Sequence, residues 1–232
     1  MHIITLSFDD GFKKSNLKIA EIYEKRGLSA CFNIIASGHV GDFVSPDEYQ
    51  DEIIKGDFAL WNELQERGHE VMPHSWKHAR LPELPLEEAI DLMERCLATF
   101  GTELAGFKRE TSVFNFPYNY SSPELEEWLT TQVRAYRTRV AGIQQGINPL
   151  PSNDTVAIGT CGFGPGNCEE NLDHCIETLL AMPEGWLVYN THGLDGEGWG
   201  PIGAGYLDRL LERLLQIESV NILPTAKTLD AS

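Results

Sequence analysis

Two short stretches of the sequence carry side chains that can bind a metal ion. Asp9 and Asp10 stand side by side in LSFDDGF, directly after an apolar run, and His74 and His78 lie four residues apart in HSWKH. On a helical turn, two histidines at this spacing project from one face, where their nitrogens can converge on one ion. A catalytic zinc site takes three protein ligands and leaves a position for water, so a carboxylate is a suitable third donor.

The paired carboxylates suggest two different roles. One aspartate would complete the metal site, and the other would take a proton from a water whose pKa the ion lowers to roughly 7. The spacing of the histidines is that of the zinc protease helix, but the glutamate base of that helix is missing, because residues 75–77 are Ser, Trp and Lys. The alternative is that Asp-Asp-Gly only closes a strand with a turn and that the histidines are unrelated to it.

The elements that would position these side chains alternate along the chain. Short runs of apolar and β-branched residues are followed by longer amphipathic stretches that end near a glycine. The predicted strands are 2–8, 29–35, 69–74, one within 106–116, 133–140, 155–161, 185–192 and 220–224. The predicted helices are 15–27 with Ser15 as a cap, 58–68, 84–101 with Gly101 as its end, 122–132, 169–182 and 204–217.

This alternation predicts an α/β fold with a parallel sheet that is either open or closed into a barrel. In both architectures the chemistry gathers at the C-terminal ends of the strands. The polar residues follow this rule, since Asp9, Asp10, His74, Asn115 and His192 all lie at or just past a predicted strand end. We therefore expect them to meet at one edge of the sheet.

Composition favours one globular domain over residues 1–232, with 42% hydrophobic residues. The formal net charge of −17 repels phosphate backbones and anionic lipid headgroups, so neither nucleic acid nor a membrane is an expected partner. The acidity indicates either plain solubility or attraction of a cationic or neutral substrate. The five cysteines form no Cys-x-x-Cys pair, which favours reduced thiols. The first residues, MHIITLSF, lack the features of a signal peptide, so we expect a cytoplasmic protein.

Four stretches together resemble the polysaccharide deacetylase (NodB-homology) family of metal-dependent carbohydrate esterases. They are TLSFDDGF, GHEVMPHSWKH, FNFPYN and LVYNTHG, and the likeness spans residues 3 to 193. The resemblance implies a distorted (β/α) barrel with about seven parallel strands. It also implies removal of N- or O-acetyl groups from sugars.

The resemblance assigns roles to individual residues. It implies that Asp10, His74 and His78 bind a divalent metal, most often zinc, with cobalt, manganese and nickel as alternatives. It implies that Asp9 is the base and His192 the acid. By the same likeness, the backbone N–H of Tyr118 would hold the oxyanion that forms when water attacks the acetyl carbonyl. The substrate would be a small acetylated carbohydrate or amide, with contacts to Asn115, Pro117 and Trp199.

The chain departs from the family pattern at two places. Asn115 stands where the family usually has the arginine that orients the catalytic aspartate, so the pKa of Asp9 is expected to be higher and its position looser. Arg109 or a later arginine could replace it. The family's fourth motif, an Asp followed by Trp, has no counterpart in CGFGPGN, which occupies that region.

These departures keep three functions open. The first is a deacetylase acting on an N-acetylated sugar or a related small amide. The second is a metal-dependent hydrolase of another linear or cyclic amide, and the third is a catalytically silent, carbohydrate-binding relative. The glycine-rich loop after His192 carries Trp199, which either stacks on a sugar ring or anchors the loop to the core.

Overall fold

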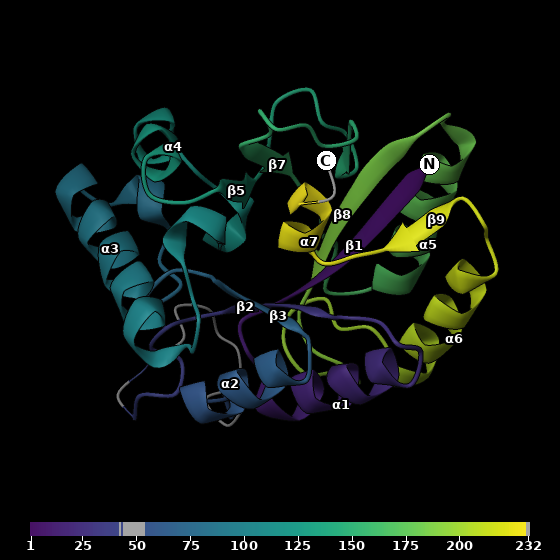
Figure 1. The fold of residues 1–232 in the computed structure, drawn as a ribbon, viewed down its shortest axis with the longest axis horizontal. Helices are drawn as coiled ribbons and strands as arrows, with labels where there is room; N and C mark the ends of the chain where they lie inside the picture. The colour runs from purple at the N-terminus through teal and green to yellow at the C-terminus, as the bar shows by residue number, and fades with distance from the viewer. Residues whose placement is uncertain (42, 44–53, 231–232) are drawn as a thin grey trace.

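The computed structural model describes residues 1–41, 43 and 54–230 (Figure 1). Its strands are β1 His2–Asp9, β2 Cys31–Ile34, β3 Glu70–Pro73, β4 Val113–Asn115, β5 Ala135–Thr138, β6 Ile147–Asn148, β7 Ala157–Gly159, β8 Gly185–Thr191 and β9 Val220–Ile222. One sheet has the order β3-β2-β1-β8-β6, with β9 paired to the first residues of β1. The other has the order β4-β5-β7. Among these strands of the described chain all pairings are parallel except that of β6 with β8.

The two sheets meet at both of their edges. Between β3 and β4, the Asn115 side-chain amide donates to the carbonyl of Pro73 at 3.3 Å. After β7, the N–H of Cys161 donates to the carbonyl of Val188 in β8 at 3.3 Å. The parallel strands β1-β2-β3-β4-β5-β7-β8 therefore follow one another around a distorted barrel, which confirms the predicted fold.

β1 shows how the sequence sets the two faces of this barrel. All of its residues are buried, as expected for a parallel strand that is covered on both sides. Ile4, Leu6 and Phe8 belong to the core that the helices share with the strands. Ile3 on the opposite face belongs to a second apolar cluster. Its strand residues come from β1, β4, β5, β7 and β8, with Trp186 of β8 as the largest, so this cluster fills the interior of the barrel.

The helices surround the strands (Figure 1). They are α1 Lys13–Glu24, α2 Phe58–Glu66, α3 Leu86–Glu103, α4 Pro123–Thr130, α5 Cys168–Ala181, α6 Ala204–Leu215 and α7 Thr225–Asp230, with the 3-10 turns η1 Leu81–Glu83, η2 Arg109–Thr111 and η3 Pro117–Asn119. Leu229 of α7 packs into the interior cluster, so α7 closes the N-terminal end of the barrel. In the described part of the chain, no helix has the length and apolar character that a bilayer crossing requires.

Two details of the predicted helices are wrong. Ser15 does not cap α1, because the helix begins at Lys13 and the buried Ser15 hydroxyl donates to the carboxylate of Glu197. Gly101 does not end α3, which runs on to Glu103. The sequence also did not predict β6 or α7, which are too short, at 2 and 6 residues, for a periodic pattern to stand out.

Candidate metal centre and active-site pocket

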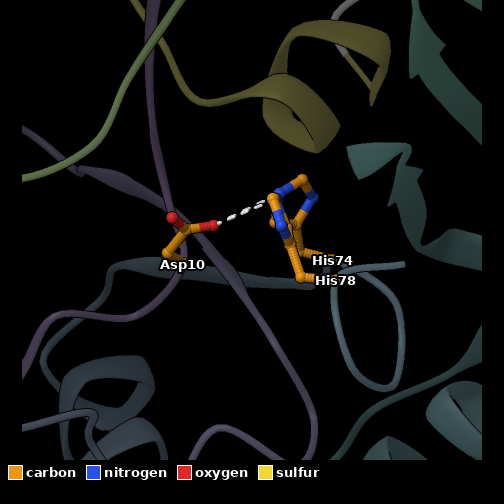
Figure 2. A group of neighbouring side chains, drawn as sticks. All are labelled: Asp10, His74 and His78. Atoms are coloured by element: carbon orange, nitrogen blue, oxygen red, sulfur yellow. Dashed lines mark ion pairs between the residues drawn. The ribbon is translucent and has the colours of Figure 1, made fainter. Parts of the chain in front are cut away.

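Asp10, His74 and His78 lie together at the C-terminal end of the barrel (Figure 2). Oδ1 of Asp10 is 3.5 Å from Nε2 of His74 and 3.4 Å from Nε2 of His78. All three residues are buried, and one ligand atom from each lies within 4.8 Å of the others. The structure thus brings together the three residues that were predicted as metal ligands.

The protonation of this cluster indicates that it fits a cation. His74 Nδ1 lies 2.9 Å from the backbone carbonyl of Asn115, so Nδ1 carries the proton and Nε2 presents a lone pair. Burial lowers the pKa of His74 to about 4 despite the neighbouring Asp9, which keeps the imidazole neutral at pH 7. The Asp10 Oδ1 that faces it is buried and has no hydrogen-bond partner among the described residues. A carboxylate oxygen and an imidazole lone pair repel one another at this distance, so the residues present fit a divalent metal ion between them.

Left-handed backbone turns aim these ligands at one another. Asp10 has φ 75° and is followed by Gly11 with φ 80°, a region that glycine enters without strain. Ser75 and His78 also have positive φ, and the Ser75 hydroxyl accepts the N–H of His78 at 3.0 Å. The prediction of a helical turn over 74–78 is therefore wrong, because a loop with two left-handed residues directs both imidazoles to the same point.

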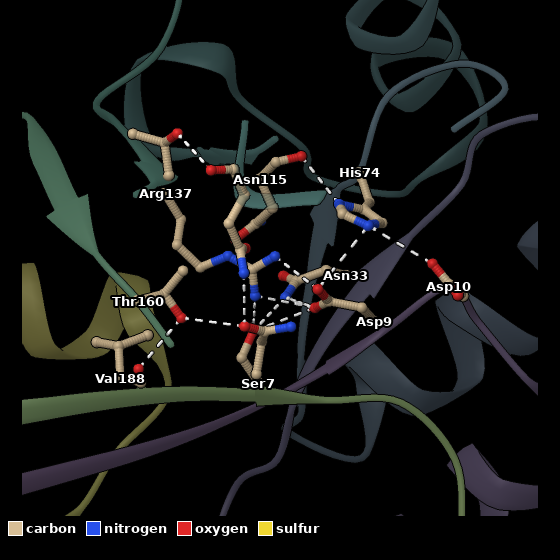
Figure 3. Close-up of polar contacts among 12 residues, drawn as sticks. Ser7, Asp9, Asp10, Asn33, His74, Asn115, Arg137, Thr160 and Val188 are labelled. Atoms are coloured by element: carbon tan, nitrogen blue, oxygen red, sulfur yellow. Dashed lines mark hydrogen bonds and ion pairs between the residues drawn. The ribbon is translucent and has the colours of Figure 1, made fainter. Parts of the chain in front are cut away.

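Asp9 is held on the other side of His74 by a buried arginine (Figure 3). The two terminal nitrogens of Arg137 donate to the two carboxylate oxygens of Asp9 at 2.6 and 3.0 Å, and Arg137 is fully buried. Asn33 adds a hydrogen bond to Oδ1 at 2.8 Å. Burial by itself raises the pKa of Asp9, but Arg137 and then His74 lower it, so the net pKa is below its usual range. The expected higher pKa and looser position of Asp9 are therefore wrong.

The arginine comes from the strand next to the one where the family motif places it. β4 and β5 pair in register with Asn115 opposite Arg137, so the two side chains start from the same level of the barrel. Asn115 instead uses its side chain to bind the carbonyls of Pro73 and Val113. Of the two replacements considered, a later arginine is confirmed, and Arg109 is wrong because it pairs with Glu94 at 2.6 Å on the outside of the barrel.

His192 follows β8 and faces the same pocket. Its ring lies edge to face with that of Trp199, at 5.7 Å between centroids. His192 is 8% exposed, and its Nδ1 has no hydrogen-bond partner among the side chains and backbone that the structure describes. Among the described residues, no carboxylate therefore bonds to Nδ1 of His192. This agrees with the absence of the family's fourth motif, whose Asp would support this histidine.

These residues line a cavity of about 470 Å³, which is in the size range of small-molecule sites. Its walls include Asp9, Asp10, His74, His78, Arg80, Tyr118, Asn119, Arg139, Ile143, Gln145, Thr160, Cys161, Gly162, Asn190, His192 and Trp199. The Tyr118 ring lies 4.6 Å from that of His78, and Tyr118 has φ 58° in the short turn η3. Of the predicted substrate contacts, Trp199 lines the cavity, whereas Asn115 and Pro117 are buried behind its wall.

The sequence matches the family described as polysaccharide deacetylase over residues 2–132, which is more than half of the chain. The chain belongs to the polysaccharide deacetylase family. Asp9, Asp10, His74 and His78 of this polysaccharide deacetylase family member all lie within the matched residues. No curated protein matches the sequence.

Solved structures similar to this polysaccharide deacetylase family member have the same fold. The Xyl-CE4 domain of a multidomain xylanase from the hindgut metagenome of Trinervitermes trinervoides has a TM-score of 0.65 and 13% identity, and the match covers 99% of this chain and 90% of that one. Peptidoglycan deacetylase PdaC from Bacillus subtilis has a TM-score of 0.59 and 14% identity, with 99% and 90% covered. BA3943, a CE4 family pseudoenzyme from Bacillus anthracis, has a TM-score of 0.62 and 11% identity, with 99% and 66% covered. At these identities the likeness supports the fold.

Sequence reasoning named no function for Arg137, Asn33 or Ser7. The stretch RAYRTRV did hold a signal, because an arginine in the middle of a predicted strand has to be buried with a partner. Arg139 follows directly after the end of β5, two residues beyond Arg137. Ser7 accepts a hydrogen bond from Arg137 at 2.6 Å, which completes the polar group around Asp9.

Proposed function

We propose that this protein is a metal-dependent deacetylase that removes an acetyl group from an N-acetylated sugar or a related small amide. Membership of the polysaccharide deacetylase family supports the deacetylation of acetylated sugars. One observation carries the proposal of metal-dependent hydrolysis. The lone pairs of Asp10, His74 and His78 converge beside Asp9, and these four residues line one cavity. Arg137 holds Asp9 in place from behind the cavity wall.

Asp10, His74 and His78 would hold the metal, with zinc as the best match to this donor set. A divalent ion bound there supplies a Lewis acid that lowers the pKa of a water and polarises a carbonyl oxygen. The Nδ1–H bond of His74 to Asn115 fixes the tautomer in which Nε2 is the donor atom. Cavity walls around these ligands keep bulk water away and strengthen every charge interaction inside.

Asp9 would accept a proton from the attacking water. Its lowered pKa keeps it ionised at neutral pH but also makes it a weak base, so it depends on a water that has been acidified. The two bonds from Arg137 leave the carboxylate no freedom to rotate, so its position relative to the substrate is fixed.

His192 would protonate the departing nitrogen, because an amine anion is too poor a leaving group to depart unassisted. The Trp199 ring, which lies nearly perpendicular to the imidazole, restricts its orientation. Tyr118 contributes the backbone N–H at the turn η3, where we place the developing oxyanion. Trp199 also offers an apolar face to a sugar ring, since it lines the cavity.

Acetate release from a panel of N-acetylated sugars and small amides, measured with zinc, cobalt, manganese or nickel, tests the proposal. Asp9→Asn should keep the metal and lose turnover, whereas His74→Ala should lose both. His174→Ala is the matched control, because this histidine lies on α5 and outside the cavity, and it should change neither. A purified protein that binds no divalent ion and releases no acetate would overturn the proposal.

A catalytically silent binding protein is the second candidate. The buried His192 Nδ1 without a partner among the described residues favours it, and BA3943, with a similar fold, is described as a pseudoenzyme. Tight binding of an acetylated sugar without turnover under any metal would support this candidate. We also propose that the protein works in the cytoplasm on a small substrate, which cell fractionation with an antibody would test.

A further inference from the structure

The cavity differs in charge from the rest of the protein. The chain has 35 acidic against 18 basic residues, but Asp9 and Asp10 are the only carboxylates among the described residues that line the cavity. The charge of Asp9 is matched by Arg137, and that of Asp10 belongs to the metal cluster. Arg80 and Arg139 add two positive charges to the same walls.

Arg80 is held at the cavity wall by an aromatic ring. Its guanidinium lies over the ring of Tyr118, 3.9 Å from the centroid, and the Tyr118 ring lies in turn beside His78. Stacking on the face of a guanidinium leaves its N–H donors available around the edge. The residue is exposed, so those donors are within reach of a ligand that enters from solvent.

Arg139 borders the other side of the same short turn. It follows β5, two residues beyond Arg137, and its backbone N–H donates to the carbonyl of Asn119 at 3.0 Å. Arg80 and Arg139 therefore both contact η3, one through Tyr118 and the other through Asn119. The two cations belong to one wall of the cavity.

Neither arginine has a carboxylate partner within the described part of the chain, and the same holds for Arg134 and Arg209, which lie outside the cavity. Several surface arginines pair with an acid at 2.9 Å or less, namely Arg26 with Asp208, Arg67 with Glu24, Arg109 with Glu94 and Arg213 with Asp173. In a chain with 35 acidic and 18 basic residues, two guanidinium groups at a cavity wall that have no carboxylate partner among the described residues are available for a ligand.

We propose that the substrate is an acetylated sugar that carries an anionic group, a carboxylate or a phosphate, and that Arg80 and Arg139 bind this group. The inference rests on the proposed deacetylase function and adds the class of substrate. Guanidinium groups bind both anions with two parallel hydrogen bonds, and the shared η3 wall places both cations beside the reacting centre. A neutral sugar would leave these donors to water, and a cationic one would be repelled.

Three probes that share one N-acetylated ring test the proposal: N-acetylglucosamine, its 6-phosphate and N-acetylmuramic acid, which carries a carboxylate. We expect at least one anionic probe to have a kcat/KM about tenfold above the neutral one, because a charge-assisted pair contributes that much binding. The phosphate and carboxylate arms identify which anion the site takes. If the kcat/KM of the neutral probe equals or exceeds that of both anionic probes, the inference is overturned and the deacetylase function stays intact.

Variants give the second arm of the test. Arg80→Met and Arg139→Met keep an unbranched apolar stem without the charge, and each should reduce the preference for the anionic probe by about tenfold. Arg213→Met removes a guanidinium from α6, outside the cavity, and should leave the preference unchanged. Calorimetric binding of the same probes to Asp9→Asn measures recognition without turnover. Arginine-dependent binding of an anionic probe there supports the inference even if acetate is never released, and equal binding by all the arginine variants contradicts it.

Discussion

The two ends of the barrel interior are built from the same strands but have opposite chemistry. At the N-terminal end, Ile3, Val113, Ala135 and Trp186 form an apolar plug with Leu229 of α7. At the C-terminal end, the same strands place polar side chains inward, from Ser7 and Asp9 in β1, Asn115 in β4 and Arg137 in β5. Only two to six residues along each strand separate the two environments.

The difference shows that alternation along a strand decides whether a side chain points into the barrel. The position along the strand decides whether that side chain is apolar or polar. In β1 the inward residues run Ile3, Thr5, Ser7 and Asp9, from apolar to charged, and the outward residues between them stay apolar. The apolar plug excludes water and gives rigidity, and the polar end contains a buried charge pair that costs desolvation energy. We therefore expect substitutions at the two ends to affect stability and activity in different combinations.

Removing the buried cation should have the largest effect. Arg137→Met leaves Asp9 buried without its partner, so we expect the free energy of unfolding to fall by about 3–5 kcal/mol and turnover to be lost. Urea denaturation and acetate release measure the two effects. Arg109→Met is the control, because its exposed pair with Glu94 should contribute less than about 1 kcal/mol.

The double variant Asn115→Arg/Arg137→Asn extends this test. The two positions are opposite one another in the β4–β5 register, so the exchanged arginine should reach Asp9 again and restore part of the turnover. We expect Asp9 to require a guanidinium group, whichever strand supplies it. A double variant as inactive as Arg137→Asn alone would contradict this expectation.

Truncation at the apolar end should affect stability alone. Ile3→Ala opens a cavity in the plug, and the expected loss is about 2–4 kcal/mol in the free energy of unfolding. Metal affinity and kcat of the folded protein should stay at wild-type values, because Ile3 lies outside the active-site cavity. Loss of metal binding in a variant that is still folded would show that the two ends are coupled.

Glu70 is the exception at the apolar end and gives the smallest predicted effect. Burial raises the pKa of this carboxyl from 4.5 to about 7, although Cys31 and the backbone N–H groups at the start of α7 donate to it. Because the folded protein then binds a proton that the unfolded chain has lost, stability should fall as the pH rises from 4.5 to about 7 and be constant beyond. We expect a loss of no more than about 3 kcal/mol.

Glu70→Gln should flatten this part of the profile, because the amide keeps an acceptor for the N–H of Ala226 without titrating. Thermal unfolding at pH 5 to 8 in steps of half a unit, with EDTA present to remove bound metal, measures the profile. Glu184→Gln, at an exposed position ahead of β8, is the matched control and should keep the wild-type slope. A Glu70→Gln profile as steep as that of the wild type would contradict the assignment of the slope to Glu70.

The sequence predicted the strand order along the chain and the metal cluster, because those depend on local pattern and on residues within single motifs. It did not place the cation beside Asp9, since the register between β4 and β5 follows from their pairing in three dimensions. The loop over 74–78 was also mispredicted, because a spacing of four residues fits a helix as well as a loop with two left-handed residues. The convergence of the two imidazoles was nevertheless predicted correctly.

The delivery of the arginine by β5 instead of β4 has a consequence for recognising relatives. A text pattern that demands arginine ahead of Phe-Pro-Tyr would discard this chain as defective, although the positive group stands where the carboxylate needs it. Surveys that divide such proteins into active and inactive members should therefore ask whether a cation lies beside the aspartate in the structure. They should not require that it come from one particular segment.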